Sequence, residues 1–286
     1  MLPTGITPPR LFLTMPVGKL VTGSLKSLGL PQVLVPQGLL LRDNESPWDT
    51  FRKAFTCELA GTVIIAVHRL RPSRVVAIRQ YAAKDSDRML HLFRNIQHGN
   101  ILMVKECYRT KDAMYAHMHD YPLTLEHIVW CGDVYPTHQQ LSLIVGQIID
   151  GLSYLSSAGF EHRSLSCSNI LLDLLGNIRI GALEFCVEQS LENSQSEMIK
   201  ALANITMILM QKHEKDDRGD GNPVMGVEDT DRWPLDSPAF QFLLATSSAS
   251  SIAELRQHAF VSHRPPRGEL VDLARFALIA ARISYL

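Results

Sequence analysis

The stretch of residues 161–173 holds the side chains with the most obvious chemical potential. Ser164, Ser166 and Cys167 could each act as a nucleophile, because a hydroxyl or thiol attacks an electrophile once a base removes its proton. Such a nucleophile needs a base and an orienting group fixed beside it, and the sequence alone fixes neither. We therefore do not predict covalent catalysis from these three residues.

Metal binding also has little support in the sequence. His117, His119 and His162 are the histidines that could suggest a metal site, but no paired ligands stand at the spacing that zinc needs. The five cysteines are scattered and form no C-x-x-C pair. An odd, scattered set is typical of reduced thiols in an intracellular protein. We expect no metal site and a cytoplasmic location, with the nucleus as the alternative.

Composition narrows the class of protein. Hydrophobic residues make up 46% of the 286 residues and charged residues 20%, which suits a sizeable core and argues against wholesale disorder. The net charge is -1, so no overall field attracts nucleic acid or anionic lipid. We interpret the basic cluster of Arg69, Arg71 and Arg74 as a solvated turn. No apolar run reaches the roughly twenty residues of a membrane span, and we expect neither a nucleic acid nor a membrane as partner.

The chain divides into three parts by residue composition and hydrophobic pattern. Residues 1–45 are rich in proline and predict an extension. Residues 46–121 predict a small β-rich lobe of strand, strand, helix, strand and strand, with a turn at residues 71–73 between the first two strands. Residues 122–286 are mainly helical, with Gly159 ending a long helix and a hairpin around Gly176. The fold class predicted is α+β.

The longest motif in the chain resembles the protein kinase catalytic loop, H-R-D-L-x-x-x-N. His162, Arg163, Leu165 and Asn169 match that pattern, and the apolar NILLD that follows matches too. VAIRQ is similar to the family's strand motif V-A-I-K, RNIQHGNI to the end of its αC helix, and AELRQHAF to the motif that closes the domain. The matches over residues 50–265 are most similar to the PAK branch of Ser/Thr kinases. This resemblance implies a bilobal kinase fold, with a small N-lobe and a larger helical C-lobe.

The same resemblance implies that the phosphoryl-transfer machinery is degenerate. The family's base Asp is Ser164, its neighbouring Lys is Ser166, its D-F-G Asp is Ala182, its αC Glu is Met89 and its strand Lys is Arg79. The glycines of the phosphate loop fall on Thr56, Glu58 and Gly61, so two of the three are lost. Asn169 alone of the metal-holding residues remains. We predict no metal site, and Glu184 is a weak candidate to replace the missing Asp.

Other family positions survive only as apolar or small residues. The resemblance implies a vestigial nucleotide cleft, made of Gly61, Val63, Ala77, Arg79, Met118, Asn169 and Leu171. It also implies a column that links the lobes, made of Phe93, Val104, His162 and Leu183. Each of these residues is equally compatible with plain core packing. The activation segment looks truncated, and the Arg that its family Glu would pair with is replaced by Ala249.

The expected function is that of a PAK-like pseudokinase, which binds, scaffolds or allosterically regulates a partner protein without a cofactor. An active kinase is one candidate partner, and the oligomeric state is open. The alternative is a residual Ser/Thr kinase that binds ATP and Mg²⁺ weakly through a relocated cation such as Lys53 or Lys84. A decayed kinase without a role is a third possibility. We expect the amphipathic helix over residues 269–286 to pack on its own lobe, with a partner-binding helix as the alternative.

Overall fold

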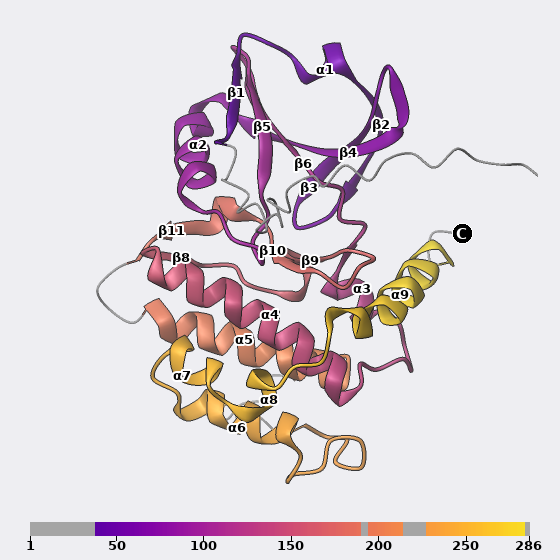
Figure 1. The fold of residues 1–286 in the computed structure, drawn as a ribbon, viewed down its shortest axis with the longest axis vertical. Coiled ribbons are helices and arrows are strands. Elements are labelled where there is room, and N and C mark those ends of the chain that lie inside the picture. The colour runs from indigo at the N-terminus through magenta and orange to yellow at the C-terminus, as the bar shows by residue number, and fades with distance from the viewer. Residues whose placement is uncertain (1–37, 190–193, 214–226, 284–286) are drawn as a thin grey trace, which may run out of the picture. The chain divides into compact units, whose positions relative to one another are not determined.

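The computed structural model describes residues 38–189, 194–213 and 227–283, and these form two lobes (Figure 1). The N-lobe is built on a six-stranded sheet of order β1-β5-β6-β4-β3-β2. β1 pairs with β5 in parallel, and the other neighbours are antiparallel. The strands are β1 (Leu40–Asp43), β2 (Phe51–Glu58), β3 (Thr62–His68), β4 (Arg71–Ala82), β5 (Val104–Arg109) and β6 (Ala113–Met118).

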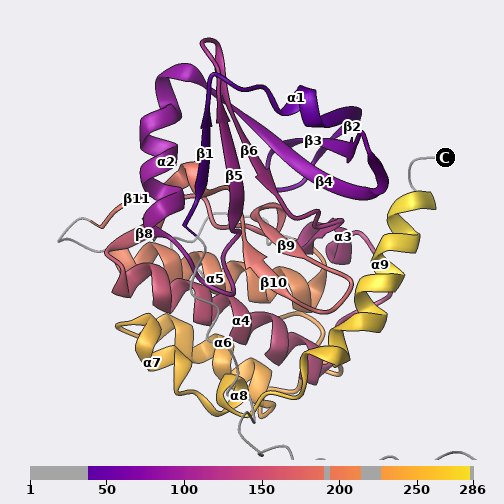
Figure 2. The same ribbon diagram turned by 45° about the horizontal axis from the view of Figure 1, so that its top comes forward.

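Helix α2 (Ser86–Asn95) follows β4 through the 3-10 turn η1 (Ala83–Asp85). Its inner face buries Met89, Leu90, Leu92 and Phe93 at the helical spacing that the sequence predicts. In Figure 2 the helix stands on the flank of the sheet that carries β1 and β5. A second, short helix, α1 (Pro47–Thr50), lies between β1 and β2.

Two details of the N-lobe differ from the sequence prediction. The extension was expected to run to residue 45, but β1 is part of the sheet and α1 packs Trp48 edge-on against Tyr115, so the folded lobe includes residues from 40 onwards. The remaining residues of that extension, 1–37, lie outside the described residues. The turn between β3 and β4 lies at Arg69 and Leu70 rather than at residues 71–73, because β4 already begins at Arg71.

The C-lobe is mainly helical, as predicted. Its helices are α3 (Leu125–Val129), α4 (His138–Ser157), α5 (Ser194–Gln211), α6 (Pro238–Ser248), α7 (Ile252–Arg256), α8 (Ala259–Ser262) and α9 (Val271–Ile283). Its short strands are β7 (Leu123–Thr124), β8 (Phe160–His162), β9 (Ile170–Leu172), β10 (Ile178–Ile180) and β11 (Cys186–Glu188). The 3-10 turns are η2 (Cys167–Asn169), η3 (Leu183–Phe185) and η4 (Arg267–Leu270).

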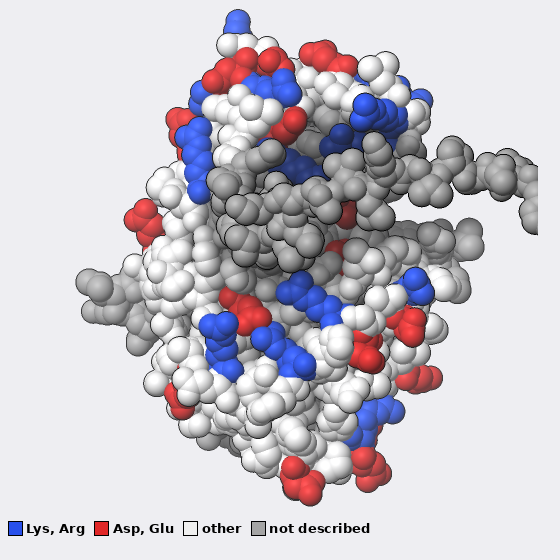
Figure 3. All heavy atoms as spheres, in the orientation of Figure 1, with Lys and Arg blue, Asp and Glu red and all other residues white. Residues whose placement is uncertain are grey.

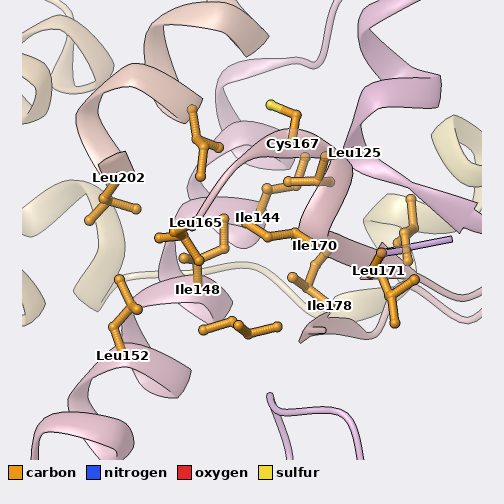
Figure 4. Packing of buried hydrophobic residues seen from close by; sticks show 14 of the residues in the cluster. Leu125, Ile144, Ile148, Leu152, Leu165, Cys167, Ile170, Leu171, Ile178 and Leu202 are labelled. Carbon is orange, nitrogen blue, oxygen red and sulfur yellow. The ribbon is translucent and has the colours of Figure 1, made fainter. Parts of the chain in front are cut away.

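Helix α4 is the centre of the C-lobe core. It begins at a capping box, in which Thr137 accepts from the Gln140 amide and the Gln140 side chain accepts from the Thr137 amide. It ends before Gly159, whose φ of +78° suits a residue without a β-carbon. Figure 4 shows Ile144 and Ile148 pointing from this helix toward Leu165 and Ile170 of the catalytic-loop region. The core of the helical lobe therefore supports the motif-bearing loop directly.

A buried polar network ties the two lobes together. Asn100 donates through Nδ2 to Gln147 Oε1 at 3.2 Å and to the Ile178 carbonyl at 3.0 Å. Gln147 also accepts from the Ile178 amide at 3.1 Å and donates to the Gly176 carbonyl at 3.0 Å. The Leu102 amide donates to the Ile180 carbonyl at 2.9 Å. The segment between α2 and β5 is thus joined both to α4 and to the β9–β10 hairpin.

Helix α9 packs on its own lobe against α3 (Figure 2). Leu273, Ala274 and Ala277 are buried on its inner face, as the amphipathic pattern predicts, while Phe276 and Ile279 are exposed. No helix in the described part of the chain is long and apolar enough to cross a membrane.

Candidate functional site

The turn between β2 and β3 lies against Gly181, in the segment after β10 that we call the floor. Leu59, Ala60 and Gly61 form this turn, where the family's phosphate loop would be. Ala60 is buried and has a φ of +57°. It lies directly on Gly181, because a β-carbon added to Gly181 would come within 2.7 Å of the Ala60 β-carbon. The loop and the floor are therefore in van der Waals contact.

Arg79 occupies the space beneath this turn. Its guanidinium fills the position next to Gly61, where an added β-carbon would meet Nη2 at 1.7 Å. The same Nη2 donates to Glu184 Oε1 at 2.5 Å, and the Arg79 side chain is only 8% exposed. Glu184 thus neutralises the strand cation from the C-lobe side.

The backbone around Ala182 brings Glu184 to this position. Ala182 adopts the left-handed conformation, with φ +51° and ψ 45°, and the 3-10 turn η3 follows at once. Arg88 of α2 donates to the Glu184 carbonyl at 3.0 Å, which fixes the turn against the helix. Met89, at the family's αC Glu position, is fully buried among apolar residues. The pairing role expected of that position has passed to Glu184.

The catalytic-loop backbone keeps its internal hydrogen bonds. His162 is buried and bonds through Nε2 to the Gly181 carbonyl at 3.0 Å, while its Nδ1 accepts from the Ser164 amide at 3.3 Å. Because Nδ1 accepts, the proton lies on Nε2. Burial lowers the pKa of His162, which keeps the ring neutral.

The hydroxyls at the former catalytic positions face their own loop. Ser166 and Ser168 share a hydrogen bond of 2.8 Å between their Oγ atoms. The Asn169 side chain donates through Nδ2 to the Ser164 carbonyl at 2.6 Å. The backbone amide of Asn169 donates to the Ser166 carbonyl at 3.1 Å. Asn169 therefore acts as a brace of the loop, and neither Ser164 nor Ser166 has a base beside its oxygen among the described residues.

The apolar positions that the resemblance assigns to the nucleotide cleft all belong to the large buried core that runs through both lobes. Val63, Ala77, Met118 and Leu171 belong to it, each 3–4% exposed. Ala77 and Met118 are direct partners across β4 and β6. The column positions Phe93 and Leu183 belong to the same cluster, with Val104 half-buried against it, and His162 is buried as a polar residue. The positions are close-packed in the manner of a core.

These residues do not fit a nucleotide with Mg²⁺. Mg²⁺ needs several hard oxygen ligands in near-octahedral order. Ala182 supplies none, one Glu184 oxygen is paired with Arg79, and the Asn169 amide nitrogen is held by the loop. No group of three or more His, Cys, Asp or Glu side chains able to hold a metal occurs among the described residues. The volume beneath the turn is taken by the Arg79 guanidinium.

Sequence reasoning missed the most informative partner in this site. It named Arg79 at the family's strand Lys position and in the vestigial nucleotide cleft, and considered Glu184 only as a replacement for the missing metal-binding Asp. The signal available was a lone carboxylate two residues after the D-F-G Asp position, and it does not state which cation that carboxylate meets. The contribution of Arg88 had no signal in the sequence.

Comparison with known proteins establishes the family. The sequence model of the family described as "Protein kinase domain" matches residues 56–205, which is more than half of the chain. This chain belongs to the protein kinase domain family. The β-sheet N-lobe and helical C-lobe described above agree with the bilobal fold that the sequence predicts.

Several curated relatives share this domain. The chain is 25% identical over 156 residues to the STE20-related kinase adapter protein strd-1 of Caenorhabditis elegans, covering 50% of this chain and 39% of the relative. It is 27% identical over 147 residues to the serine/threonine-protein kinase CST20 of Candida albicans, covering 48% of this chain and 12% of the relative. It is 27% identical over 149 residues to the mitogen-activated protein kinase kinase kinase 1a of Physcomitrium patens, covering 47% of this chain and 19% of the relative. The chain thus spans well under half the length of these relatives.

Proposed function

We propose that this chain is a PAK-like pseudokinase domain, which binds or allosterically regulates a partner protein and does not transfer phosphate. The observation that carries the proposal is the Arg79–Glu184 ion pair beneath Gly61, next to an alanine at the metal-binding position. In a kinase that neighbourhood holds phosphates and Mg²⁺. Here the chain's own carboxylate supplies the negative charge, so the closed arrangement of turn and floor does not depend on a ligand.

The energetic argument supports loss of catalysis. Removing one well-placed electrostatic group typically costs an enzyme about 3–4 kcal/mol of barrier. Here the base, the metal-holding Asp, the strand Lys with its αC partner, and two of the three loop glycines are all replaced. Residues 183–193 alone connect Ala182 to α5, which leaves little chain to dock a peptide substrate. A family mechanism cannot operate with these parts.

A protein partner is the natural ligand for a kinase fold that retains its shape. The relative strd-1 is named a kinase adapter protein, and this supports an adapter role in which an active kinase is the partner. The proposed location of such an adapter is the cytoplasm.

A weak Ser/Thr kinase remains the second candidate, because one observation favours it. Glu184 Oε2 is buried and accepts no hydrogen bond from the described residues, so a cation could in principle approach it. The relatives CST20 and the moss protein are named as protein kinases. Only a direct nucleotide measurement separates the two candidates.

The decisive experiment is a thermal-unfolding titration of the full chain with ATP and Mg²⁺, paired with a phosphotransfer assay. A ligand that binds the native state at a hundred times its Kd stabilises it by about 2.7 kcal/mol, which raises the unfolding midpoint. We expect no rise at millimolar nucleotide, and no turnover even after Ser164→Asp and Ala182→Asp are combined. A clear rise, or activity recovered by that double substitution, would favour the weak kinase instead.

The adapter role is tested separately. We expect the chain to co-purify with an intact protein kinase from its native host, and the two purified proteins to form a complex on mixing. If the chain binds no kinase and no other protein in reconstituted form, the adapter role is wrong even when nucleotide binding is absent.

A further inference from the structure

The end of the N-lobe sheet that carries the β3–β4 turn presents an exposed basic surface. It comprises Arg52 and Lys53 in β2, Arg69 and Leu70 in the turn, and Arg71 and Arg74 at the start of β4. The strand register brings their strands together at this end of the sheet, since His68 of β3 lies opposite both Phe51 of β2 and Arg71 of β4. We call this set the basic turn surface. Figure 3 shows blue spheres collected at the end of the upper lobe where β2 and β4 lie in Figure 1.

Among the described residues, the five cations of this surface have no carboxylate as a counter-ion. Within the described part of the chain, none of them forms an ion pair with a carboxylate. Arg79, Arg109 and Arg264, by contrast, each lie within 3.1 Å of a carboxylate. Asp49 in α1 is a neighbouring acid, yet it pairs with no described cation either. In a chain of net charge -1, this excess of positive charge is a local feature.

The turn is held in shape before any partner arrives. The Arg69 amide donates to the Thr50 carbonyl and its Nε to the Trp48 carbonyl, both at 3.0 Å. The Leu70 amide donates to His68 Nδ1 at 3.1 Å. Lys53 Nζ lies 4.2 Å from the centre of the Trp48 ring. A surface fixed in this way loses little conformational entropy on binding, which favours affinity.

Neighbouring groups respond to the same positive field. Burial lowers the pKa of Lys105, and the charge of Arg74 lowers it further. Burial also lowers the pKa of His119, with additional contributions from Lys105 and Arg74. An anion at this surface would relieve that repulsion.

The tip of the turn adds an apolar anchor. Leu70 is 87% exposed and stands between Arg69 and Arg71. Four of the five cations are arginines, whose planar guanidinium binds carboxylates in a bidentate manner. We propose that the basic turn surface docks an acidic, carboxylate-rich segment of a protein partner, with Leu70 entering an apolar site on that partner. This proposal rests on the adapter function above and names the surface through which the partner is held.

The composition of the surface favours a protein over other polyanions. Single-stranded nucleic acid binds where several exposed aromatic rings stack on successive bases. The turn residues 69–75 contain no aromatic residue, Lys53 covers the Trp48 ring, and Phe55 is the one exposed ring beside the described surface. A membrane-bound element buries a broad apolar face, whereas Leu70 and Val75 are the large apolar side chains of this turn.

The first test uses the full chain and a labelled Glu-Glu-Leu repeat peptide, with binding followed by fluorescence polarisation. We expect binding that weakens as salt rises. Arg71→Glu combined with Arg74→Glu should weaken it at least about tenfold, because close charge pairs dominate such contacts. Leu70→Ser should weaken it without changing the salt dependence. Lys200→Glu combined with Arg275→Glu changes the net charge equally on the C-lobe and should leave the affinity unchanged.

Several outcomes would overturn the proposal. Equal loss in the C-lobe variant would show that net charge alone decides binding. Equal binding of a Lys-Lys-Leu peptide would exclude electrostatic recognition. Displacement of the Glu peptide by phosphatidylserine vesicles or an oligonucleotide at lower concentration would assign the surface to those anions. If a partner kinase binds the wild type and the Arg71/Arg74 variant alike, the proposal that this surface docks the partner is wrong, but the adapter function is not contradicted. If no kinase binds either form, the adapter function fails on its own.

Discussion

Arg79 and Glu184 form an ion pair of 2.5 Å between a strand of the N-lobe and the 3-10 turn that follows Ala182. The pair joins two elements that are 105 residues apart in the chain. It therefore acts as a clamp between the lobes, in a place where the family relies on a contact within the N-lobe. Met89, which the resemblance places at the family's αC Glu position, is fully buried and brings no second carboxylate to this region.

The first prediction concerns this pair. Glu184→Ala leaves the Arg79 charge buried without a partner and should lower the free energy of unfolding by about 2–3 kcal/mol, somewhat below the range for fully buried pairs because Glu184 is partly exposed. Arg79→Met combined with Glu184→Met should cost less than the sum of the losses in the single variants Arg79→Met and Glu184→Met. Urea denaturation measures Glu184→Ala and the three Met variants. Lys200→Ala is the control, because the side chains of Lys200 and its partner Glu197 are 67% and 76% exposed, and its loss should change stability by less than about 1 kcal/mol.

The second prediction concerns the contact between the turn and the floor. Gly181→Ala places a β-carbon 2.7 Å from that of Ala60 and should destabilise the protein by about 1–3 kcal/mol through overpacking. Ala60→Gly removes the opposing carbon and relieves the positive φ, so the double variant should recover much of the loss. Thermal unfolding of the three variants checks this. Simple addition of the two single effects would mean that the turn does not touch Gly181.

A third prediction tests the polar junction of the lobes. Gln147→Met keeps the side-chain shape but leaves the Ile178 amide and the Gly176 carbonyl without their partner. Each buried group left unpaired costs roughly 1–3 kcal/mol, so the loss of partners for these two groups should lower the free energy of unfolding by about 2–6 kcal/mol. Gln139→Met on the exposed face of the same helix is the matched control and should be nearly neutral. If Gln147→Met and Gln139→Met change the free energy of unfolding equally, the buried polar network does not stabilise the protein.

The fourth prediction is a pH dependence centred on His117. The His117 ring is buried, and its centroid lies 5.1 Å from that of the Phe51 ring. Neither ring nitrogen has a hydrogen-bond partner in the described structure. Burial lowers the pKa of His117 to about 4. The unfolded chain, with a His pKa of about 6.5, binds the proton first. Stability is therefore full above about pH 6.5 and falls as the pH drops toward 4, by at most about 1.4 kcal/mol per pH unit for one proton.

His117→Phe should flatten that slope, because the variant has no proton to bind in the unfolded state. His263→Gln on the C-lobe surface should leave it unchanged. Free energies of unfolding measured between pH 7.5 and 5 in urea make the comparison. A slope identical in wild type and His117→Phe would place the pH dependence on other groups, of which buried His162 is the first candidate.

Much of the fold was predictable because periodicity reports burial. The strands β3 and β4, the helices α2 and α4, and the β9–β10 hairpin all appear where their patterns place them. Strands β1 and β2 were missed, since β2 is exposed over most of its length and shows no alternation. The turn at Arg69 and Leu70 lacks glycine and proline, so the nearby Pro72 attracted the prediction instead.

The sequence predicted which family residues are replaced in the site, but it did not predict which side chains contact each other there. Aligning a motif identifies what stands at each position, and Ala182, Ser164 and Met89 follow from that alone. The Arg79–Glu184 pair depends on the left-handed backbone of Ala182 and on the hold of Arg88, and these are set by packing between distant segments. No spacing in the sequence encodes them.

In the sheet formed by the described residues, β2 is an outer strand that pairs with β3 alone, and most of its residues are exposed. Open edges of this kind invite other chains to add as extra strands, and charged side chains on them discourage it. Arg52 and Lys53 stand on this strand beside the exposed ring of Phe55. Neutralising them should therefore promote self-association and insoluble material, so the same cations guard the solubility of the protein.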